Sequence, residues 1–80
     1  MLNSTNKLSI FYSNINGFVS KIDSLAHILQ STSPDVVVIC ELKTKSVPSV
    51  KNFFDKLNYS AIVCIESGIA IAAKKKIQDS

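Results

Sequence analysis

The run Val36–Cys40 (VVVIC) constrains the fold of this chain more than any other feature of its sequence. It contains no polar residue, and β-branched residues fill four of its five positions. A short, continuous run of this kind indicates a β-strand that is buried on both faces, and such strands are usually parallel members of a sheet covered by helices. The sequence therefore predicts an α/β fold.

The segments before this run complete a β-α-β unit. Leu8–Ser13 mixes β-branched and aromatic residues, which predicts a first strand. Ser20–Gln30 predicts a helix, because its apolar residues recur at i, i+3, i+4 and i+7. Ser20 and Asp23 have the spacing of a capping box. We expect the two strands to be parallel and joined by a right-handed crossover through this helix. The apolar positions of the helix are Ile22, Leu25, Ala26 and Leu29.

The rest of the chain predicts a second helix and a hairpin. Pro48–Leu57 repeats apolar residues at helical spacing, and its proline suits a first turn. Tyr59–Ile65 and Ile69–Ala73 predict two strands, joined by the short link 66–68. The expected fold is thus a β-α-β unit that is extended by a second helix and a hairpin.

The composition suggests that a covering layer is missing. The chain has 80 residues, of which 46% are hydrophobic, so it is one small domain or part of a larger one. A short chain this apolar is expected to leave a sheet face and a strand edge exposed, which favours self-association. Cys40 and Cys64 fit no zinc spacing, and we expect them to be buried, reduced thiols without a disulfide partner.

Polar side chains follow the two strands of the β-α-β unit where each strand ends. Asn14 and Asn16 come after the first strand, and Glu41 follows the second. Because ligands collect at the carboxyl ends of parallel strands, we expect Asn14 and Glu41 to meet at one edge of the sheet. Amide and carboxylate oxygens are ligands that Mg²⁺ prefers. The spacing alone also fits a second interpretation, in which these are ordinary polar residues where strands reach solvent.

Four stretches of the sequence resemble the opening of endonuclease/exonuclease/phosphatase domains, most closely the non-LTR retrotransposon type related to apurinic endonucleases. Asn14–Gly17 (NING) is similar to the motif that ends the first strand in that family. Pro34–Asp35, the apolar run and Glu41 are similar to the motif that ends the second strand. The resemblance covers about Leu8 to Lys75. The four stretches are YSNINGFVSKIDSL, SPDVVVICELK, FFDKLNYSAIV and GIAIAAKK.

The resemblance implies a phosphodiesterase that uses Mg²⁺ or Mn²⁺ to cleave DNA, built as a two-sheet α/β sandwich of which this chain is a partial half. Glu41 would bind the metal, and Asn14 would act with it as a catalytic and metal-site residue that orients water or phosphate. Asn16 and Lys43 would contact the phosphate or nucleic-acid backbone. The chain departs from the family at Cys40 and Leu42, where relatives carry Gln and Thr.

The resemblance also implies an incomplete domain over residues 1–80. The family's later Asp-x-Asn and Ser-Asp-His segments have no counterpart here, and the only histidine, His27, is expected on the exposed side of the first helix. Two hypotheses follow: a fragment of a retrotransposon endonuclease that is inactive alone, or a non-enzymatic remnant that acts as a small binding or interaction module.

Charge and hydropathy limit the possible binding partners and the cellular location of the protein. The net charge of +3 results from nine lysines, with no arginine, against six acidic residues. This balance suits contact with a polyanion such as DNA but not bidentate reading of bases. The first residues, MLNSTNKL, lack the apolar segment of a signal peptide, and no apolar run is long enough to span a membrane. We therefore expect an intracellular protein, nuclear or cytoplasmic, without membrane contact.

Overall fold

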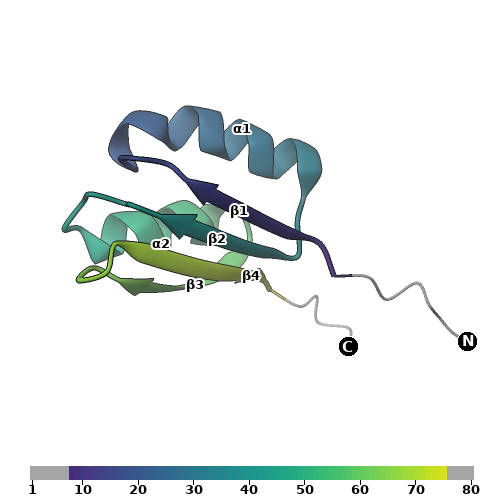
Figure 1. The fold of residues 1–80 in the computed structure, drawn as a ribbon. Coiled ribbons are helices and arrows are strands. Elements are labelled where there is room, and N and C mark those ends of the chain that lie inside the picture. The colour runs from purple at the N-terminus through teal and green to yellow at the C-terminus, as the bar shows by residue number, and fades with distance from the viewer. Residues whose placement is uncertain (1–7, 76–80) are drawn as a thin grey trace, which may run out of the picture.

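The computed structural model describes residues 8–75, which form a four-stranded sheet with two α-helices against one of its faces (Figure 1). The strands lie in the order β1-β2-β4-β3. β1 and β2 are parallel, whereas β4 pairs antiparallel with both β2 and β3. The elements are β1 (Ile10–Asn14), a 3₁₀ turn (Val19–Lys21), α1 (Ile22–Thr32), β2 (Val36–Cys40), α2 (Val47–Lys56), β3 (Tyr59–Cys64) and β4 (Ile69–Lys74).

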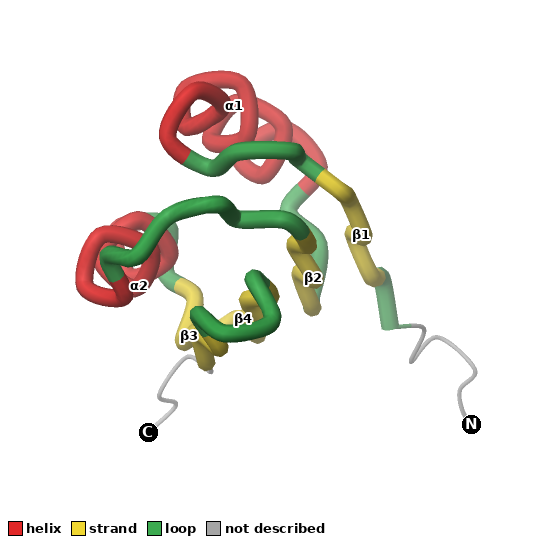
Figure 2. The backbone as a smooth tube through the Cα atoms, turned by 60° about the vertical axis from the view of Figure 1, so that its left-hand side comes forward, coloured by secondary structure: helices red, strands yellow, loops and turns green. Residues whose placement is uncertain are grey.

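β2 has the predicted bounds and a central position, but only one of its faces is covered. Val37 and Ile39 are fully buried on the side of the helices. Val36, Val38 and Cys40 alternate with them and remain partly exposed. The expectation that this strand is buried on both faces is therefore wrong for the described residues. Figure 2 shows the reason, since α1 and α2 both lie on the same side of the sheet.

The first helix begins later than the sequence predicts. A 3₁₀ turn occupies Val19–Lys21, α1 starts at Ile22, and no side chain caps its first turn. The predicted capping box of Ser20 and Asp23 is therefore wrong. The helix ends at Thr32, and the following residue, Ser33, adopts a left-handed backbone (φ 48°) and donates its N–H to the carbonyl of Leu29 at 2.8 Å. This geometry is a common helix stop.

The second helix is fixed by a cap and by an aromatic cluster. The hydroxyl oxygen of Ser46 accepts a hydrogen bond from the backbone N–H of Ser49 at 3.3 Å, which satisfies one of the free donors of the first turn. Phe54 is fully buried, and Phe53 lies edge-on to it and to Phe18, with ring centroids 5.1 and 5.2 Å apart. Such edge-to-face pairs add to the stabilisation from burial.

Pro34 and Asp35 fix the amino ends of the parallel strands β1 and β2, at the edge of the sheet opposite to the predicted site. The Asp35 carboxylate accepts from the backbone N–H of Ser9 at 3.0 Å, and the N–H of Asp35 donates to the Ser9 carbonyl at 2.9 Å. The buried hydroxyl of Tyr59 donates to the carbonyl of Pro34. These bonds fix the register with which β1 and β2 start, so that their carboxyl ends finish side by side.

The face of the sheet away from the helices is uncharged and largely apolar; we call it the open face. Its central row crosses all four strands through Tyr12, Val38, Ile71 and Ile62, which are paired in register. Tyr12 is 65% exposed, and Ile62 is 76% exposed. The open face consists of Ile10, Tyr12, Asn14, Val36, Val38, Cys40, Ser60, Ile62, Cys64, Ile69, Ile71 and Ala73.

The two cysteines are free thiols, and both lie on the open face. Cys64 is exposed and Cys40 is half-buried, so the expectation of buried thiols is wrong for Cys64. It failed because the strand alternation places Cys64 on the side that no helix covers. Within residues 8–75, no helix is long and apolar enough to cross a membrane.

Candidate functional site

The site lies at the carboxyl ends of β1 and β2, where Asn14 and Glu41 meet. Nδ2 of Asn14 donates a hydrogen bond to Oε2 of Glu41 over 3.0 Å. Asn14 is the last residue of β1, and Glu41 follows the last residue of β2. In the parallel register Asn14 pairs with Cys40, so Glu41 lies one position beyond it. The two strand tips that the sequence predicts to converge are thus in direct contact, and both side chains are exposed to solvent.

Backbone hydrogen bonds continue the β1–β2 pairing beyond the sheet and fix the loops that carry the site. The N–H of Ile15 donates to the carbonyl of Cys40 at 3.1 Å. The N–H of Gly17 donates to the carbonyl of Glu41 at 2.8 Å. The N–H of Phe18 donates to the carbonyl of Leu42 at 2.7 Å. The side chain of Glu41 therefore projects from a backbone that is paired on both sides of it.

Three non-glycine residues at these tips adopt a left-handed backbone. The φ angles are 47° at Asn16, 57° at Glu41 and 52° at Lys43. Asparagine tolerates this region, but glutamate and lysine do so at a free-energy cost of about 1 kcal/mol or more. Strain of this kind persists where the surrounding structure imposes it, and it concentrates at functional sites.

The side chain of Leu42 anchors the loop that carries the site to the hydrophobic core. It is fully buried, whereas Glu41 before it and Lys43 after it are exposed. Its N–H donates to the carbonyl of Gly68 at 3.0 Å, which ties the strand tip to the β3–β4 turn. Gly68 has a φ of 70°, the left-handed region that glycine adopts without strain. The leucine that departs from the family motif is thus a hydrophobic anchor in this chain.

A second polar pair joins the same two loops. The ammonium group of Lys43 hydrogen-bonds to Oδ1 of Asn16. Lys21 reaches the same loop from the 3₁₀ turn, and its Nζ donates to the carbonyl of Ile15 at 3.0 Å. All four predicted site residues are therefore brought to one edge of the sheet, in two hydrogen-bonded pairs: Asn14 with Glu41, and Asn16 with Lys43.

A shallow groove of about 450 Å³ runs from Glu41 to the β3–β4 turn. Its lining holds two lysines, two hydroxyl side chains and two carboxylates, those of Glu41 and Glu66. That chemistry suits a polar or charged ligand more than an apolar one. Its lining residues are Glu41, Lys43, Thr44, Lys45, Ile65, Glu66, Ser67 and Gly68.

The donor set fits part of a magnesium shell. Glu41 supplies a carboxylate whose Oε2 is oriented by Asn14, and Asn14 retains its amide oxygen, since its nitrogen makes the bond. Both are hard oxygen donors of the type that Mg²⁺ and Mn²⁺ prefer. Within residues 8–75, however, no group of three or more His, Cys, Asp or Glu side chains could enclose a metal. His27 is exposed on α1.

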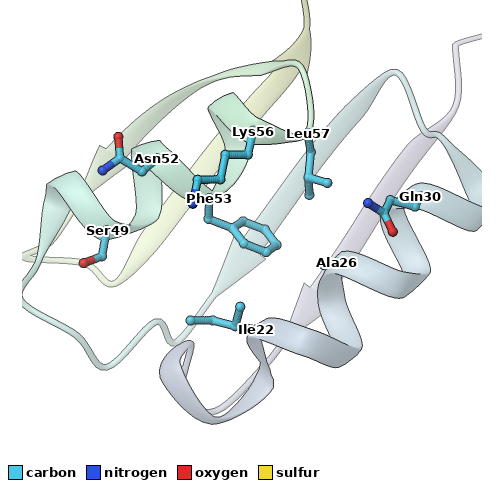
Figure 3. Close-up of a pocket in the computed structure, with 8 residues that line it drawn as sticks. All are labelled: Ile22, Ala26, Gln30, Ser49, Asn52, Phe53, Lys56 and Leu57. Atoms are coloured by element: carbon cyan, nitrogen blue, oxygen red, sulfur yellow. The ribbon is translucent and has the colours of Figure 1, made fainter.

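A second cavity, of about 500 Å³, lies between the helices and belongs to a different surface (Figure 3). The ring of Phe53 points toward Ile22 across its floor, while Gln30, Asn52 and Lys56 lie at its rim. Only one charged side chain lines it, and no pair of polar groups converges there. It has the character of a seam between two helices rather than of a reaction centre.

The sequence interpretation missed two parts of the site. It identified Leu42 only as a departure from a motif, although a leucine directly after a buried strand and a carboxylate is a signal for an inward-pointing anchor. It also left out the turn that contains Gly68, because nothing in the sequence shows which loop lies beside Glu41. That neighbourhood arises from the antiparallel pairing of β2 with β4.

The comparison with solved structures identifies the fold. An AP endonuclease from Archaeoglobus fulgidus matches with a TM-score of 0.75 over 88% of this chain, at 22% sequence identity. The chain spans 28% of the length of that protein. No protein-family model matches the chain, and no curated protein sequence does. The described residues therefore have an AP-endonuclease-like fold, and the predicted α/β class, compatible with a partial half of an α/β sandwich, is confirmed.

Proposed function

We propose that this chain is the N-terminal part of a metal-dependent DNA endonuclease of the non-LTR retrotransposon type, and that it does not cleave DNA alone. The observation that carries the proposal is the 3.0 Å hydrogen bond from Asn14 to Glu41 at the carboxyl ends of two adjacent parallel strands. The likeness in fold to an AP endonuclease, which covers 88% of the chain, supports it.

In this proposal Glu41 is the metal-binding residue and Asn14 sets its position. The bond from Asn14 Nδ2 occupies one lone pair of Oε2 and holds the carboxylate in one orientation. The amide oxygen of Asn14, which takes no part in that bond, would remain available to accept from water or to help hold the metal. Mg²⁺ or Mn²⁺ held there would neutralise charge on the phosphate and stabilise the departing oxygen.

Lys43 and Asn16 form the contact with the nucleic-acid backbone in this proposal. Lys43 is exposed beside Glu41, and its bond to Asn16 keeps the ammonium group at the strand tips. An ammonium group contacts phosphate as a point charge and reads no base sequence. Binding through this pair would therefore be independent of DNA sequence and sensitive to salt.

The proposed lack of activity follows from the groups that surround Glu41. Cleavage of a phosphodiester by water needs a general base within hydrogen-bond reach of that water. The described residues hold one carboxylate oriented by an amide, while the only histidine is exposed on α1. A coding sequence that continues in frame with Asp-x-Asn and Ser-Asp-His segments would supply the missing groups. Finding one would support the endonuclease origin.

Metal binding tests the site directly. Electron paramagnetic resonance of Mn²⁺ should show weak binding by the unmodified chain, and Glu41→Gln should weaken it by about tenfold or more. Glu66→Gln is the matched control, because Glu66 lines the same groove but has no bond to Asn14. Equal loss of Mn²⁺ binding in both variants, or no loss in either, would contradict the assignment of Glu41.

A nicking assay tests the second half of the proposal. The unmodified chain with Mg²⁺ is expected to leave supercoiled plasmid intact. Robust nicking that Glu41→Ala abolishes would show that the chain is a complete nuclease and would refute the proposed inactivity.

One observation favours a second candidate function, that of a small non-enzymatic interaction module. The open face is uncharged and presents Tyr12 and Ile62 largely exposed, as expected of a surface that binds another protein surface. This candidate predicts that Glu41→Gln leaves every binding property of the chain unchanged. An Mn²⁺ affinity that depends on Glu41 separates the two functions.

A further inference from the structure

The chain has two glycines, and both bind the peptide group that follows Glu41. The N–H of Gly17 donates to the carbonyl of Glu41 at 2.8 Å, and the carbonyl of Gly68 accepts from the N–H of Leu42 at 3.0 Å. That carbonyl and that N–H are the two polar ends of one peptide group. Gly17 and Gly68 are the only glycines among the 80 residues. They belong to the loop after β1 and to the β3–β4 turn, which lie at the same edge of the sheet (Figure 1).

We propose that Gly17 and Gly68 are positioning residues, which hold Glu41 in its left-handed conformation and thereby place its carboxylate against Asn14. We call the two glycines and their bonds to this peptide group the glycine clamp. The proposal rests on the metal-binding role proposed for Glu41 and identifies what fixes the geometry of that residue. Neither glycine touches the metal or the phosphate in this proposal, since both act through the backbone of Glu41.

The clamp leaves Glu41 no freedom to relax its backbone. The peptide group before Glu41 is also held, because the carbonyl of Cys40 accepts from the N–H of Ile15 at 3.1 Å. Relaxation from the observed φ of 57° to the ordinary helical value would need a rotation of roughly 120° about the N–Cα bond. That rotation would carry the Cβ atom, and the carboxylate with it, away from Nδ2 of Asn14, which now lies 3.0 Å from Oε2.

The backbone conformation of each clamp residue explains why it is a glycine. Gly68 has a φ of 70°, in the left-handed region that asparagine adopts more readily than other residues with a side chain. Gly17 has a φ of 115°, which lies outside that region. Space is not the constraint at Gly68, because an added Cβ would lie 3.6 Å from the nitrogen of Leu42 and 3.8 Å from Cα of Glu41, at ordinary contact distances. A substitution at either glycine therefore acts by straining the backbone that forms the clamp.

The side-chain amide of Asn14 reports the position of the carboxylate in the absence of any metal. In the unmodified chain one Nδ2 proton is bonded to Glu41, so it should resonate downfield of its position in Glu41→Ala. Gly68→Ala should move this resonance toward the position seen in Glu41→Ala. Gly68→Asn adds the same Cβ but tolerates a positive φ, so it should leave the resonance near its unmodified position. Gly17→Ala and Gly17→Asn should both move it, because a φ of 115° suits neither residue.

Binding of Mn²⁺ tests the consequence for the proposed metal site. Gly68→Ala should raise the dissociation constant measured by electron paramagnetic resonance by about tenfold, and Gly68→Asn should raise it less. The matched control is Tyr59→Phe, which removes the hydrogen bond to the Pro34 carbonyl at the opposite edge of the sheet. It should lower the urea midpoint, because a buried acceptor loses its partner. It should leave the Asn14 resonance and the Mn²⁺ affinity unchanged.

The same variants can overturn the glycine clamp. They do so if Gly68→Ala changes neither the Asn14 resonance nor the Mn²⁺ affinity, or if Tyr59→Phe changes both to the same extent. Equal effects of Gly68→Ala and Gly68→Asn would assign the cause to the added side chain and would also refute the clamp. If the unmodified chain binds no Mn²⁺ through Glu41, the proposed metal site fails, while the Asn14 resonance still decides the clamp. Far-UV circular dichroism establishes that each variant is folded; if Gly68→Ala unfolds, Gly17→Ala decides by the same two measurements.

Discussion

The backbone N–H of Leu42 donates to the carbonyl of Gly68 at 3.0 Å, and this bond joins the tip of β2 to the β3–β4 turn directly beside Glu41. The fully buried side chain of Leu42 strengthens the same junction from inside the core. The geometry around the proposed metal ligand thus depends on an apolar neighbour in the sequence.

Truncation of that neighbour should destabilise both the fold and the site. Leu42→Ala is expected to lower the free energy of unfolding by about 2–5 kcal/mol, because it leaves a cavity beneath the strand tip. Leu42→Met, which nearly conserves volume, should cost less than about 1.5 kcal/mol. Urea unfolding at one fixed, low protein concentration measures both, so that association does not contribute. A loss below about 1 kcal/mol for Leu42→Ala would contradict the anchoring role.

The exposed lysine at the site should contribute to DNA binding through its charge alone. Lys43→Ala is expected to weaken binding of short duplexes to a similar extent for all sequences. It should also reduce the slope of log affinity against log salt concentration by about 1. Fluorescence anisotropy over a salt series measures the slope. Lys51→Ala, which removes an exposed lysine of α2, is the control and should change the slope less. Base-dependent losses would speak against a phosphate contact.

The acid stability of the chain should depend on Asp35. Hydrogen bonds from Ser9, first of all from its backbone N–H, hold the pKa of Asp35 below its ordinary value of 3.8. The folded state therefore favours the carboxylate. The resulting stabilisation is present above the unfolded pKa and is lost as the pH falls through the lowered one. Asp35→Asn should remove this dependence, so that its urea midpoint falls less between pH 5 and pH 2 than that of the unmodified chain. Equal slopes would contradict the prediction.

The thiol of Cys64 should react at a lower pH than an ordinary cysteine. A hydrogen bond from the side chain of Ser67 holds the pKa of Cys64 below its usual value of 9.0, and the residue is exposed. Since the thiolate is the reactive form, the rate of alkylation should reach half its maximum below that pH. Ser67→Ala should shift the midpoint upward. No shift with Ser67→Ala would refute the cause.

The sequence predicts the elements of the sheet well because each strand carries its own local signal. The β-branched run gives β2 its observed bounds, and the polar residues after β1 and β2 mark the edge where Asn14 and Glu41 meet. The parallel register that joins them follows from the β-α-β order of the elements.

The errors have one physical origin, which is that tertiary contacts override local patterns. The predicted capping box at Ser20 does not form because Phe18 is buried and bonded to Leu42, which places a 3₁₀ turn over Val19–Lys21 and delays α1. Cys64 is exposed because β3 has only one covered face, although its sequence is as apolar as that of a buried strand. Whether a second layer covers a face of the sheet depends on segments elsewhere in the sequence, which the residues of the strand itself do not reveal.

The left-handed backbone at Glu41 means that a glutamate at this position lowers the stability of the fold by a measurable amount. Glycine adopts a φ of 57° without strain, so Glu41→Gly is expected to unfold at a higher urea concentration than Glu41→Ala, despite its greater freedom in the unfolded chain. Stability alone would thus favour glycine at this position. The difference in stability between these two variants, neither of which has a carboxylate, measures the backbone strain that any non-glycine residue bears at the tip of β2.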